Sequence, residues 1–435
     1  MQSAAWIRFL IVLPILALLL LGHCYWFRKL WKASERIARP GLRRLAQGLS
    51  LGGFAFVLLL LLVNAFSPRR DLMWRYGGVV GAVGLWVTSA LFAFIAVQAV
   101  AMAGWMWRLA SRLGGFEERA GEDAEKPALV DAGRRGFLQT ATLAAGALPF
   151  ACGGYGFFIG RRQYQVREVV LRVSQWPSGL EGLRIVQLSD IHIGSYMSAS
   201  EVARVVGMAN ELKPDLCVVT GDFVTGATDP LEDCARELSR LQALLGVWGC
   251  NGNHEIYAGA EEAAASLFAR RGMHVLRQEN VEIVRHRQSF NLIGVDYQRP
   301  PYDPSGRATG MLDGVERLIR RDMPNILLSH NPNAFPRAAE LGIELTLAGH
   351  THGGQVRFEL LDPRVSPARL LTPYVAGMFK RPLGAAADLE DDASWTGSGK
   401  RPASLLYVNS GLGTIFAPVR LGVPPEISLF TLRRA

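Results

Sequence analysis

The chain has 435 residues, 49% of them hydrophobic, and a formal net charge of +9, and at this length it can hold more than one domain. Residues 1–135 contain 17 Lys/Arg and 8 Asp/Glu, which gives +9, whereas residues 136–435 contain 30 of each and are neutral. The basic excess therefore belongs to the amino-terminal third, and no nucleic-acid partner is expected for the rest of the chain. The five cysteines are odd in number and show no CxxC spacing, which argues against a disulfide framework.

Four uncharged stretches in the first 160 residues are about long enough to cross a bilayer. They cover residues 9–27, 45–68, 76–107 and 136–160, and aromatic residues such as Trp26 and Trp105 lie at their ends, as interface anchors do. The fourth has the weakest signal because it is rich in Gly and Ala. We predict transmembrane helices 1–3 within residues 1–107, a cytoplasmic linker at 108–135 and a fourth transmembrane segment at 136–160.

The charges that flank these stretches predict an orientation. Residues 28–44 and 108–135 contain thirteen Lys/Arg, whereas the other two flanks contain four. Because Lys and Arg are enriched in cytoplasmic loops, we place the two basic segments in the cytoplasm. With four spans, everything after residue 160 then lies outside the cytoplasm. If the fourth stretch does not span, the large domain that follows is cytoplasmic.

The segment Gly133–Gln139, which contains Arg134 and Arg135, resembles a twin-arginine export signal because an apolar stretch follows the two arginines. Two arginines before a span are also ordinary cytoplasmic flanks. Both interpretations place the same side of this segment in the cytoplasm.

From Gln165 onward, short apolar strands alternate with helical stretches, which is typical of an α/β domain. We expect this domain to cover residues 165–435. The predicted strands are 166–173, 183–188, 216–220, 247–250, 281–285, 290–295, 326–328, 343–348, 405–409 and 427–432, and the predicted helices are 200–212, 232–245 and 260–271. Segments 298–310 and 384–401 are polar and rich in Pro, Gly or Asp, so we expect surface loops there.

Polar side chains follow directly after five of the predicted strands. They are Asp190 and His192, then Asp222, then Asn253 and His254, then His330, and finally His350 and His352. The set contains five of the eight histidines of the chain. Since the parallel strands of one sheet bring their carboxyl ends to one edge, we expect these side chains to converge there.

The segment Gly349–Gln355 shows the pattern most clearly. His350 and His352 are two residues apart, so they project to the same side of an extended segment, and the glycines around them allow a sharp turn. Across the whole set the ligands are imidazole nitrogen, carboxylate and amide oxygen without thiolate, which suits Mn²⁺, Fe or Zn²⁺. They are about enough for two ions, which one carboxylate would bridge at a separation of about 3.5–4 Å.

Together these residues resemble the calcineurin-like metallophosphoesterase superfamily. Its five blocks appear here in order, as Asp190-Ile191-His192, Gly221-Asp222, Gly252-Asn253-His254-Glu255, His330 and Gly349-His350-Thr351-His352. The resemblance covers roughly residues 165–435 and is strongest to the bacterial membrane-associated branch. It implies an α/β sandwich of two mixed sheets flanked by helices, and a multi-pass location in the bacterial inner membrane.

The resemblance also implies a role for each residue. Two divalent metal ions (Mn²⁺, Zn²⁺ or Fe) would bind, one to Asp190, His192 and His352, the other to Asn253, His330 and His350, with Asp222 as the bridge. The implied reaction is hydrolysis of a phosphate ester by attack of a metal-bound hydroxide. His254 would act as general acid or donate a hydrogen bond to the phosphoryl oxygen. Glu255 stands where many relatives have Asp and would orient His254.

Three functions stay open. The leading one is a membrane-anchored phosphoesterase whose partners are the lipid bilayer and a phosphoester substrate, with a phosphodiester favoured and a lipid-linked one open. The Ser/Thr phosphatases of this superfamily carry Asp-Arg after the second block, whereas Phe223 and Val224 follow here, which disfavours a phosphoprotein. A second function is a cytoplasm-facing pyrophosphatase of the UDP-2,3-diacylglucosamine type. A third is a membrane protein that binds metal without catalysis.

Overall fold

The computed structural model describes residues 2–66, 77–113, 127–298, 310–357, 369, 372–384 and 402–435. The chain forms two compact units, which are described separately below. The first consists of Met1–Arg70 with Val79–Tyr155, and the second of Asp71–Gly78 with Gly156–Ala435.

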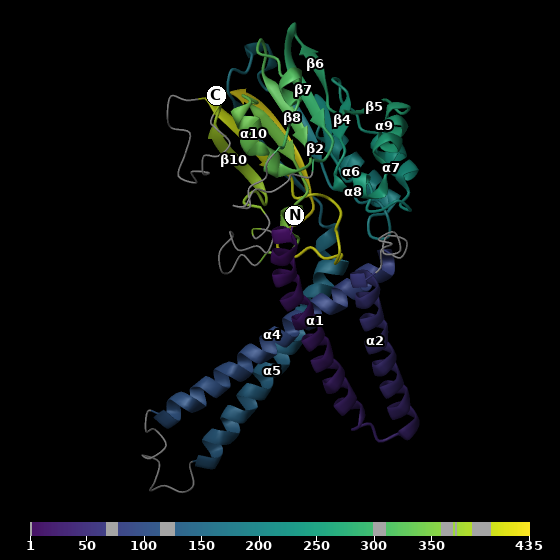
Figure 1. The fold of residues 1–435 in the computed structure, drawn as a ribbon, viewed down its shortest axis with the longest axis vertical. Helices are drawn as coiled ribbons and strands as arrows, with labels where there is room; N and C mark the ends of the chain where they lie inside the picture. Colours follow the sequence, from purple (N-terminus) through teal and green to yellow (C-terminus); the bar gives the residue numbers. More distant parts are fainter. Residues whose placement is uncertain are drawn as a thin grey trace. The chain divides into compact units, whose positions relative to one another are not determined.

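The first unit is helical (Figure 1). Its helices are α1 (Gln2–Ser34), α2 (Pro40–Phe66), α4 (Gly77–Leu113) and α5 (Pro127–Phe158), the last of which continues into the second unit. Each of the four predicted spans falls mostly or wholly within one of them. Side chains fix the packing of α1, because the imidazole of His23 stacks on Phe54 at 4.8 Å and the indole of Trp26 donates a hydrogen bond to the carbonyl of Ala90 at 2.8 Å.

Three of these helices contain segments that are long and apolar enough to cross a membrane. The segments are Pro40–Leu60, Gly78–Ala110 and Arg135–Arg162, and they match the second, third and fourth predicted spans. The first predicted span lies in α1, where many side chains fall outside the described residues. The helices therefore support membrane association of the chain.

The second unit contains two mixed sheets of six strands each, which confirms the predicted fold class. The first sheet has the order β1 (Gln165–Val173), β12 (Glu426–Arg434), β2 (Arg184–Leu188), β3 (Leu216–Thr220), β4 (Val247–Cys250), β5 (Met273–Val275). The second has the order β10 (Gly377–Pro382), β11 (Ala403–Val408), β9 (Leu345–Ala348), β8 (Asn325–Ser329), β7 (Gln288–Val295), β6 (Glu279–Arg285).

Parallel pairing dominates the centre of both sheets. Strands β2 to β5 are parallel in the first sheet, and β12 runs antiparallel to β2. In the second sheet β7, β8, β9 and β11 are parallel, whereas the edge strands β6 and β10 are antiparallel to their neighbours. The predicted strands 281–285 and 290–295 are present as β6 and β7, which pair antiparallel as a hairpin.

The hydrophobic core has a layer between the sheets and further layers on their outer faces. Successive residues of a strand point to opposite faces, so Ile185 of β2 packs between the sheets with Phe290 of β7, whereas Val186 packs against helices outside the first sheet. Both faces are thus covered, which explains why residues 216–219 of β3 are a continuous apolar run. The helices that flank the sheets are α6 (Ala199–Glu211), α7 (Leu231–Leu238), α8 (Asn253–Ala258), α9 (Glu261–Ala269) and α10 (Phe335–Glu340).

The helix ends follow local and distant signals. Helix α6 begins at a capping box, in which Ser198 and Glu201 satisfy each other's backbone N–H groups. The helix predicted at 232–245 is shorter, because α7 ends at Leu238. The side chain of Asn210 accepts a hydrogen bond from the backbone N–H of Gln242 and donates one to the carbonyl of Arg240, which holds this segment in a turn.

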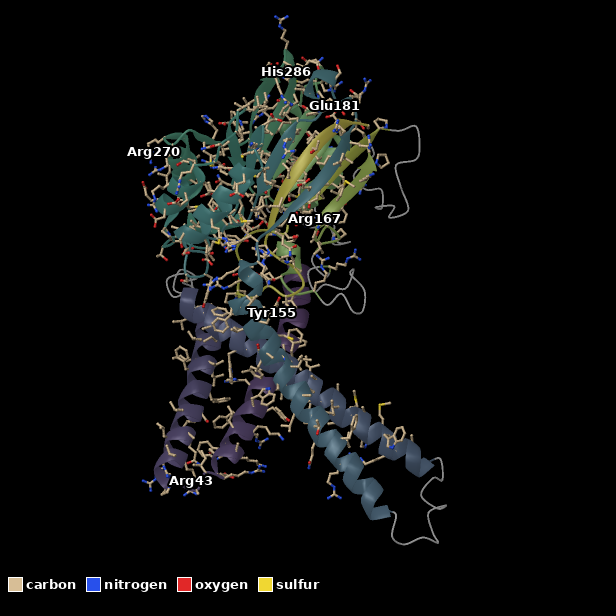
Figure 2. All side chains as sticks on the ribbon, turned by 180° about the vertical axis from the view of Figure 1, so that it is seen from behind. Arg43, Tyr155, Arg167, Glu181, Arg270 and His286 are labelled. Atoms are coloured by element: carbon tan, nitrogen blue, oxygen red, sulfur yellow. The ribbon has the colours of Figure 1, made fainter. Side chains whose placement is uncertain are left out.

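Two histidines outside the predicted set, His274 and His286, are exposed. His286 and Arg270 project from the outer surface of the domain (Figure 2). Most of the predicted loops 298–310 and 384–401 lie outside the described residues, as do residues 114–126 of the predicted linker and the side chain of Arg134.

Candidate metal centre

The carboxyl ends of five strands place the predicted ligands near one another. Asp190, His192, Asp222, Asn253 and His254 follow β2, β3 and β4 of the first sheet, and His330, His350 and His352 follow β8 and β9 of the second. The expectation that one sheet would supply all of them is therefore wrong, since the residues come from two sheets. Their ligand atoms form three overlapping groups within 4.8 Å, which are Asp190–His192–His352, His192–Asp222–His254 and Asp222–His330–His350.

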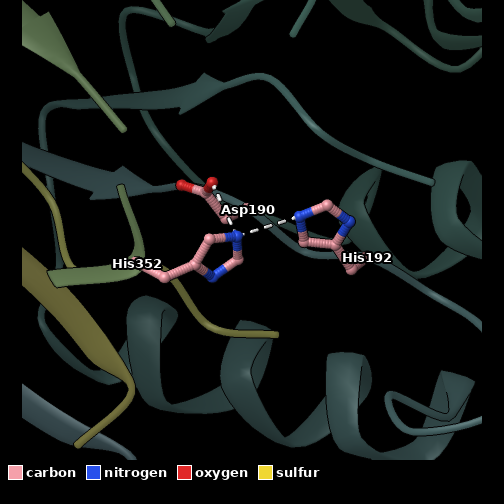
Figure 3. A group of neighbouring side chains, drawn as sticks. All are labelled: Asp190, His192 and His352. Carbon is pink, nitrogen blue, oxygen red and sulfur yellow. Dashed lines mark hydrogen bonds and ion pairs between the residues drawn. The ribbon is translucent and has the colours of Figure 1, made fainter. Parts of the chain in front are cut away.

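The first group has spacings that suit one metal ion (Figure 3). Nε2 of His352 lies 3.2 Å from Nε2 of His192 and 3.3 Å from Oδ1 of Asp190. Two ligands at about 2.0–2.1 Å from one ion, at a tetrahedral angle, are about 3.4 Å apart. All three side chains are buried, so bulk water competes little for their ligand atoms.

Asp222 connects the first group to the third. Its Oδ2 lies 3.4 Å from Nε2 of His192 and 3.1 Å from Nε2 of His330. Because these two imidazoles belong to different groups, the carboxylate occupies the position that a bridge between two ions requires. His350 completes the group on the His330 side.

Two buried polar atoms at this site make no hydrogen bond of good geometry among the described residues. They are Oδ1 of Asn253 and Nε2 of His330, and the latter makes an ion-pair contact with Asp222 instead. Leaving such an atom unsatisfied costs about 1–3 kcal/mol. A divalent cation would satisfy both atoms, so the side chains fit the metal ions that the sequence predicts.

Hydrogen bonds to the other ring nitrogen fix three imidazoles. Nδ1 of His330 lies 2.6 Å from the carbonyl of Thr220, and Nδ1 of His254 lies 2.7 Å from the carbonyl of Thr225. A carbonyl only accepts, so Nδ1 of both rings carries the donated proton, and Nε2 of His330 has a lone pair for a metal ion once that ring is neutral. Nδ1 of His192 pairs with the hydroxyl of Thr225 at 3.1 Å. These contacts turn the Nε2 atoms of His192 and His330 toward Asp222.

Burial keeps three of the imidazoles neutral, which is the form that binds metal. Burial lowers the pKa of His192 and of His350 to about 3, and it lowers the pKa of His352 well below the usual range. Neighbouring positive groups lower them further.

His330 and the two aspartates behave differently. Burial lowers the pKa of His330, but Asp222 and Asp190 outweigh it and raise the value to about 10. Burial raises the pKa of Asp190 to about 6. Burial would also raise the pKa of Asp222, yet His330 and His254 hold it well below its usual range. Without a cation, the protein thus keeps a proton on His330 at neutral pH.

The backbone at the site is strained. Five of the seven predicted ligands have a left-handed conformation, with φ of 52° at Asp190, 47° at His192, 55° at Asp222, 76° at His350 and 51° at His352. Each such residue costs of order 1–3 kcal/mol and is typical of functional sites. Gly349 allows the loop to approach closely, because a Cβ there would collide with the side chains of Ser189 and Asp190.

Glu255 organises the backbone around Asp222. Its buried carboxylate accepts hydrogen bonds of 2.7–3.2 Å from the backbone N–H groups of Gly252, Asp222, Phe223 and Val224. Burial, reinforced by Asp222, raises the pKa of Glu255 to about 7. Its predicted role in orienting His254 stays a prediction, since the ring bond described above comes from Thr225.

Sequence reasoning missed one further residue, Arg420. Its buried guanidinium donates to the carbonyl of His352 at 3.0 Å, of Ser410 at 2.6 Å and of Gly413 at 2.5 Å. Burial lowers the pKa of Arg420 to about 10, so it stays charged at neutral pH and joins the His352 loop to residues 410–413. The one sequence feature that could have identified it is that Arg420 is a single arginine within the apolar segment 415–421.

Comparison with known proteins places these features in context. The family model described as calcineurin-like phosphoesterase matches residues 183–354. An uncharacterized metallophosphoesterase, YkuE, of Bacillus subtilis is 30% identical over 69% of this chain and 97% of its own length, and an uncharacterized metallophosphoesterase of Aquifex aeolicus is 30% identical over 62% and 92%. A "Transmembrane protein with metallophosphoesterase domain" of Danio rerio is 29% identical over 65% of this chain. The matched region covers only 60% of the length of that relative.

We expect metal binding to release protons. His330 must lose its proton to bind, so Mn²⁺ affinity should rise about tenfold per pH unit between pH 6.5 and 9. Below about pH 6, where the raised pKa of Asp190 adds a second proton, the rise should be steeper. Titration calorimetry in buffers of different ionisation enthalpy measures the affinity and the protons released. An affinity that does not change between pH 6.5 and 9 would contradict this assignment.

We expect Arg420 to act as a positioning residue for His352. The substitution Arg420→Lys keeps the charge but loses the planar guanidinium whose N–H groups reach three carbonyls. The affinity for Mn²⁺ should therefore fall about 10–100-fold. Calorimetric titration measures it, with thermal unfolding of the metal-free protein as a check on folding. Arg240→Lys, at an exposed arginine paired with Glu237, is the matched control. Wild-type affinity in Arg420→Lys would refute the role.

Proposed function

The chain belongs to the calcineurin-like phosphoesterase family, and on that basis we propose that it is a membrane-anchored hydrolase of phosphate esters that works with two divalent metal ions. The observation that carries the proposal is the position of Asp222, whose Oδ2 faces His192 on one side and His330 on the other. A carboxylate between two buried imidazole groups is the arrangement that a paired metal site needs.

The two groups divide the ligands as follows. Asp190, His192 and His352 would hold one ion, Asn253, His330 and His350 the other, and Asp222 both. Mn²⁺, Zn²⁺ and Fe all suit these nitrogen and oxygen donors. When bound, such ions would activate a water molecule at neutral pH and neutralise charge on the phosphoryl group.

His254 has the position of an acid catalyst. Its ring is held by Nδ1–H donation to the carbonyl of Thr225 at 2.7 Å, and its centroid lies 4.7 Å from that of His192. The ligand set proposed above does not include His254, so we assign its Nε2 to the substrate. There it would donate a proton to the leaving alkoxide or a hydrogen bond to a phosphoryl oxygen.

The membrane-spanning helices favour a substrate at the membrane. We propose a phosphodiester, which can be lipid-linked, and we place the catalytic domain outside the cytoplasm of the bacterial inner membrane because of the thirteen basic residues in the two predicted cytoplasmic segments. The competing function, a pyrophosphatase for a nucleotide-linked lipid, needs the opposite orientation. A metal-binding protein without catalysis needs no substrate at all.

We expect Asp222→Asn to reduce hydrolysis about 100-fold or more, because the amide cannot bridge two cations as a carboxylate does. The measurement is the rate at which the detergent-solubilised full chain with Mn²⁺ cleaves a chromogenic bis-phosphodiester. Asp322→Asn, at an exposed aspartate paired with Arg320, should keep the wild-type rate. If the wild type shows no hydrolysis, the non-catalytic function is favoured; if Asp222→Asn stays fully active, the bridge is refuted.

The orientation can be measured separately. Alkaline phosphatase fused after residue 435 should be active in a bacterial host, because that enzyme folds only outside the cytoplasm. A fluorescent protein that matures only in the cytoplasm, fused at the same position, should stay dark. The reverse pattern would overturn the proposed orientation and favour the cytoplasm-facing pyrophosphatase.

A further inference from the structure

The loop Gly411–Gly422, which follows β11, carries an apolar side chain that is exposed to solvent. Its tip contains Ile415, Phe416, Ala417 and Pro418. Phe416 exposes 61% of its surface, and its φ of 62° is strained for a residue other than glycine. A large aromatic side chain held outward at such a cost suggests that this exposure has a function.

The same loop forms one wall of the metal centre. The backbone N–H groups of Leu412 and Gly413 donate to the carbonyls of Ser189 and Asp190 at 3.0 and 2.7 Å. Further along, the side chain of Gln355 exchanges two hydrogen bonds with the backbone of Ile415. Phe416 is thus the direct neighbour of a residue that is fixed to the loop bearing His350 and His352.

The loop also contacts the end of a membrane-spanning segment. The apolar segment Arg135–Arg162 ends in residues that belong to the same compact unit as the loop. The N–H of Arg420 donates to the carbonyl of Gly156 at 3.2 Å. A Cβ on Gly160 would collide with the carbonyl of Arg420, and one on Gly156 would collide with Val419. The two backbones therefore touch directly.

Apolar side chains are exposed at the end of this segment as well as at the tip of the loop. Phe158 exposes 67% of its surface and Ile159 47%, and both lie within the last residues of the segment. Placing side chains of this size in an apolar environment is favourable in proportion to the apolar surface that leaves water. A bilayer around this segment would lie next to these residues, so it is the surface that would cover Phe416 as well.

We propose that the loop Gly411–Gly422 rests on the bilayer, with Phe416 inserted at the interface, and presents the metal centre to the headgroups of lipids in that leaflet. This inference rests on the proposed phosphoesterase function and names its substrate class, a phosphodiester of a membrane lipid. In the reaction the oxygen of water bonds to phosphorus, the P–O bond to one alcohol breaks, and that alcohol leaves with a proton. The acyl chains stay in the bilayer.

Photocrosslinking tests the contact without relying on catalysis. The full chain carrying Phe416→p-benzoylphenylalanine is reconstituted in vesicles of phosphatidylethanolamine and phosphatidylglycerol with a radiolabelled lipid and is then irradiated. Leu244 is 92% exposed and precedes β4, at the end of the first sheet opposite the metal centre, so Leu244→p-benzoylphenylalanine is the matched control. We expect at least about tenfold more labelled lipid on residue 416. Equal labelling of the two variants would overturn the proposal.

Kinetics test the substrate class. The quantity to measure is kcat/KM for a vesicle-embedded phospholipid divided by kcat/KM for a soluble chromogenic bis-phosphodiester. Phe416→Ser should lower this ratio by about tenfold or more. Leu244→Ser should leave it unchanged. An unchanged ratio in Phe416→Ser would overturn the lipid substrate. Failure of the wild type to cleave either substrate would refute the proposed function instead, while the crosslinking result would still decide whether the loop lies on the membrane.

Discussion

The buried carboxylate of Asp222 is the constraint on which the metal centre depends. Moving a carboxylate out of water costs several kcal/mol unless charges and hydrogen bonds compensate. Here Nε2 of His330 lies 3.1 Å away, the backbone N–H of His254 donates to Oδ1 at 2.9 Å, and Glu255 holds the backbone on which Asp222 sits. Cations on both sides would complete the compensation, which explains why the surrounding ligand atoms are buried and, in two cases, unsatisfied.

Much of the fold and the ligand set could be predicted because the signal is local. An apolar run that ends in a polar residue marks the end of a buried strand, and this pattern located β2, β3 and β4 together with Asp190 and Asp222. The sheet to which a strand belongs is not a local property. β8 and β9 pair with each other and with strands far along the chain, so the expectation of one sheet edge was wrong although the side chains still converge.

Features that depend on distant partners escaped prediction. The helix expected at 232–245 ends early because Asn210, on another helix, binds its backbone. Arg420 follows no strand and lies 68 residues from His352, whose carbonyl it holds, so no spacing rule marks it. Its neighbours along the chain also contact the end of α5. One loop thus links the wall of the metal centre to the end of an apolar helix that is long enough to span a membrane.

The most direct test of this centre is electron paramagnetic resonance of the full chain titrated with Mn²⁺. Two ions about 3.5–4 Å apart and joined by a carboxylate are coupled magnetically. We therefore predict saturation at two Mn²⁺ per chain, with the multiline spectrum of an exchange-coupled pair. Saturation at one ion, or at two ions that give only the six-line spectrum of isolated Mn²⁺, would contradict a bridged pair at Asp222.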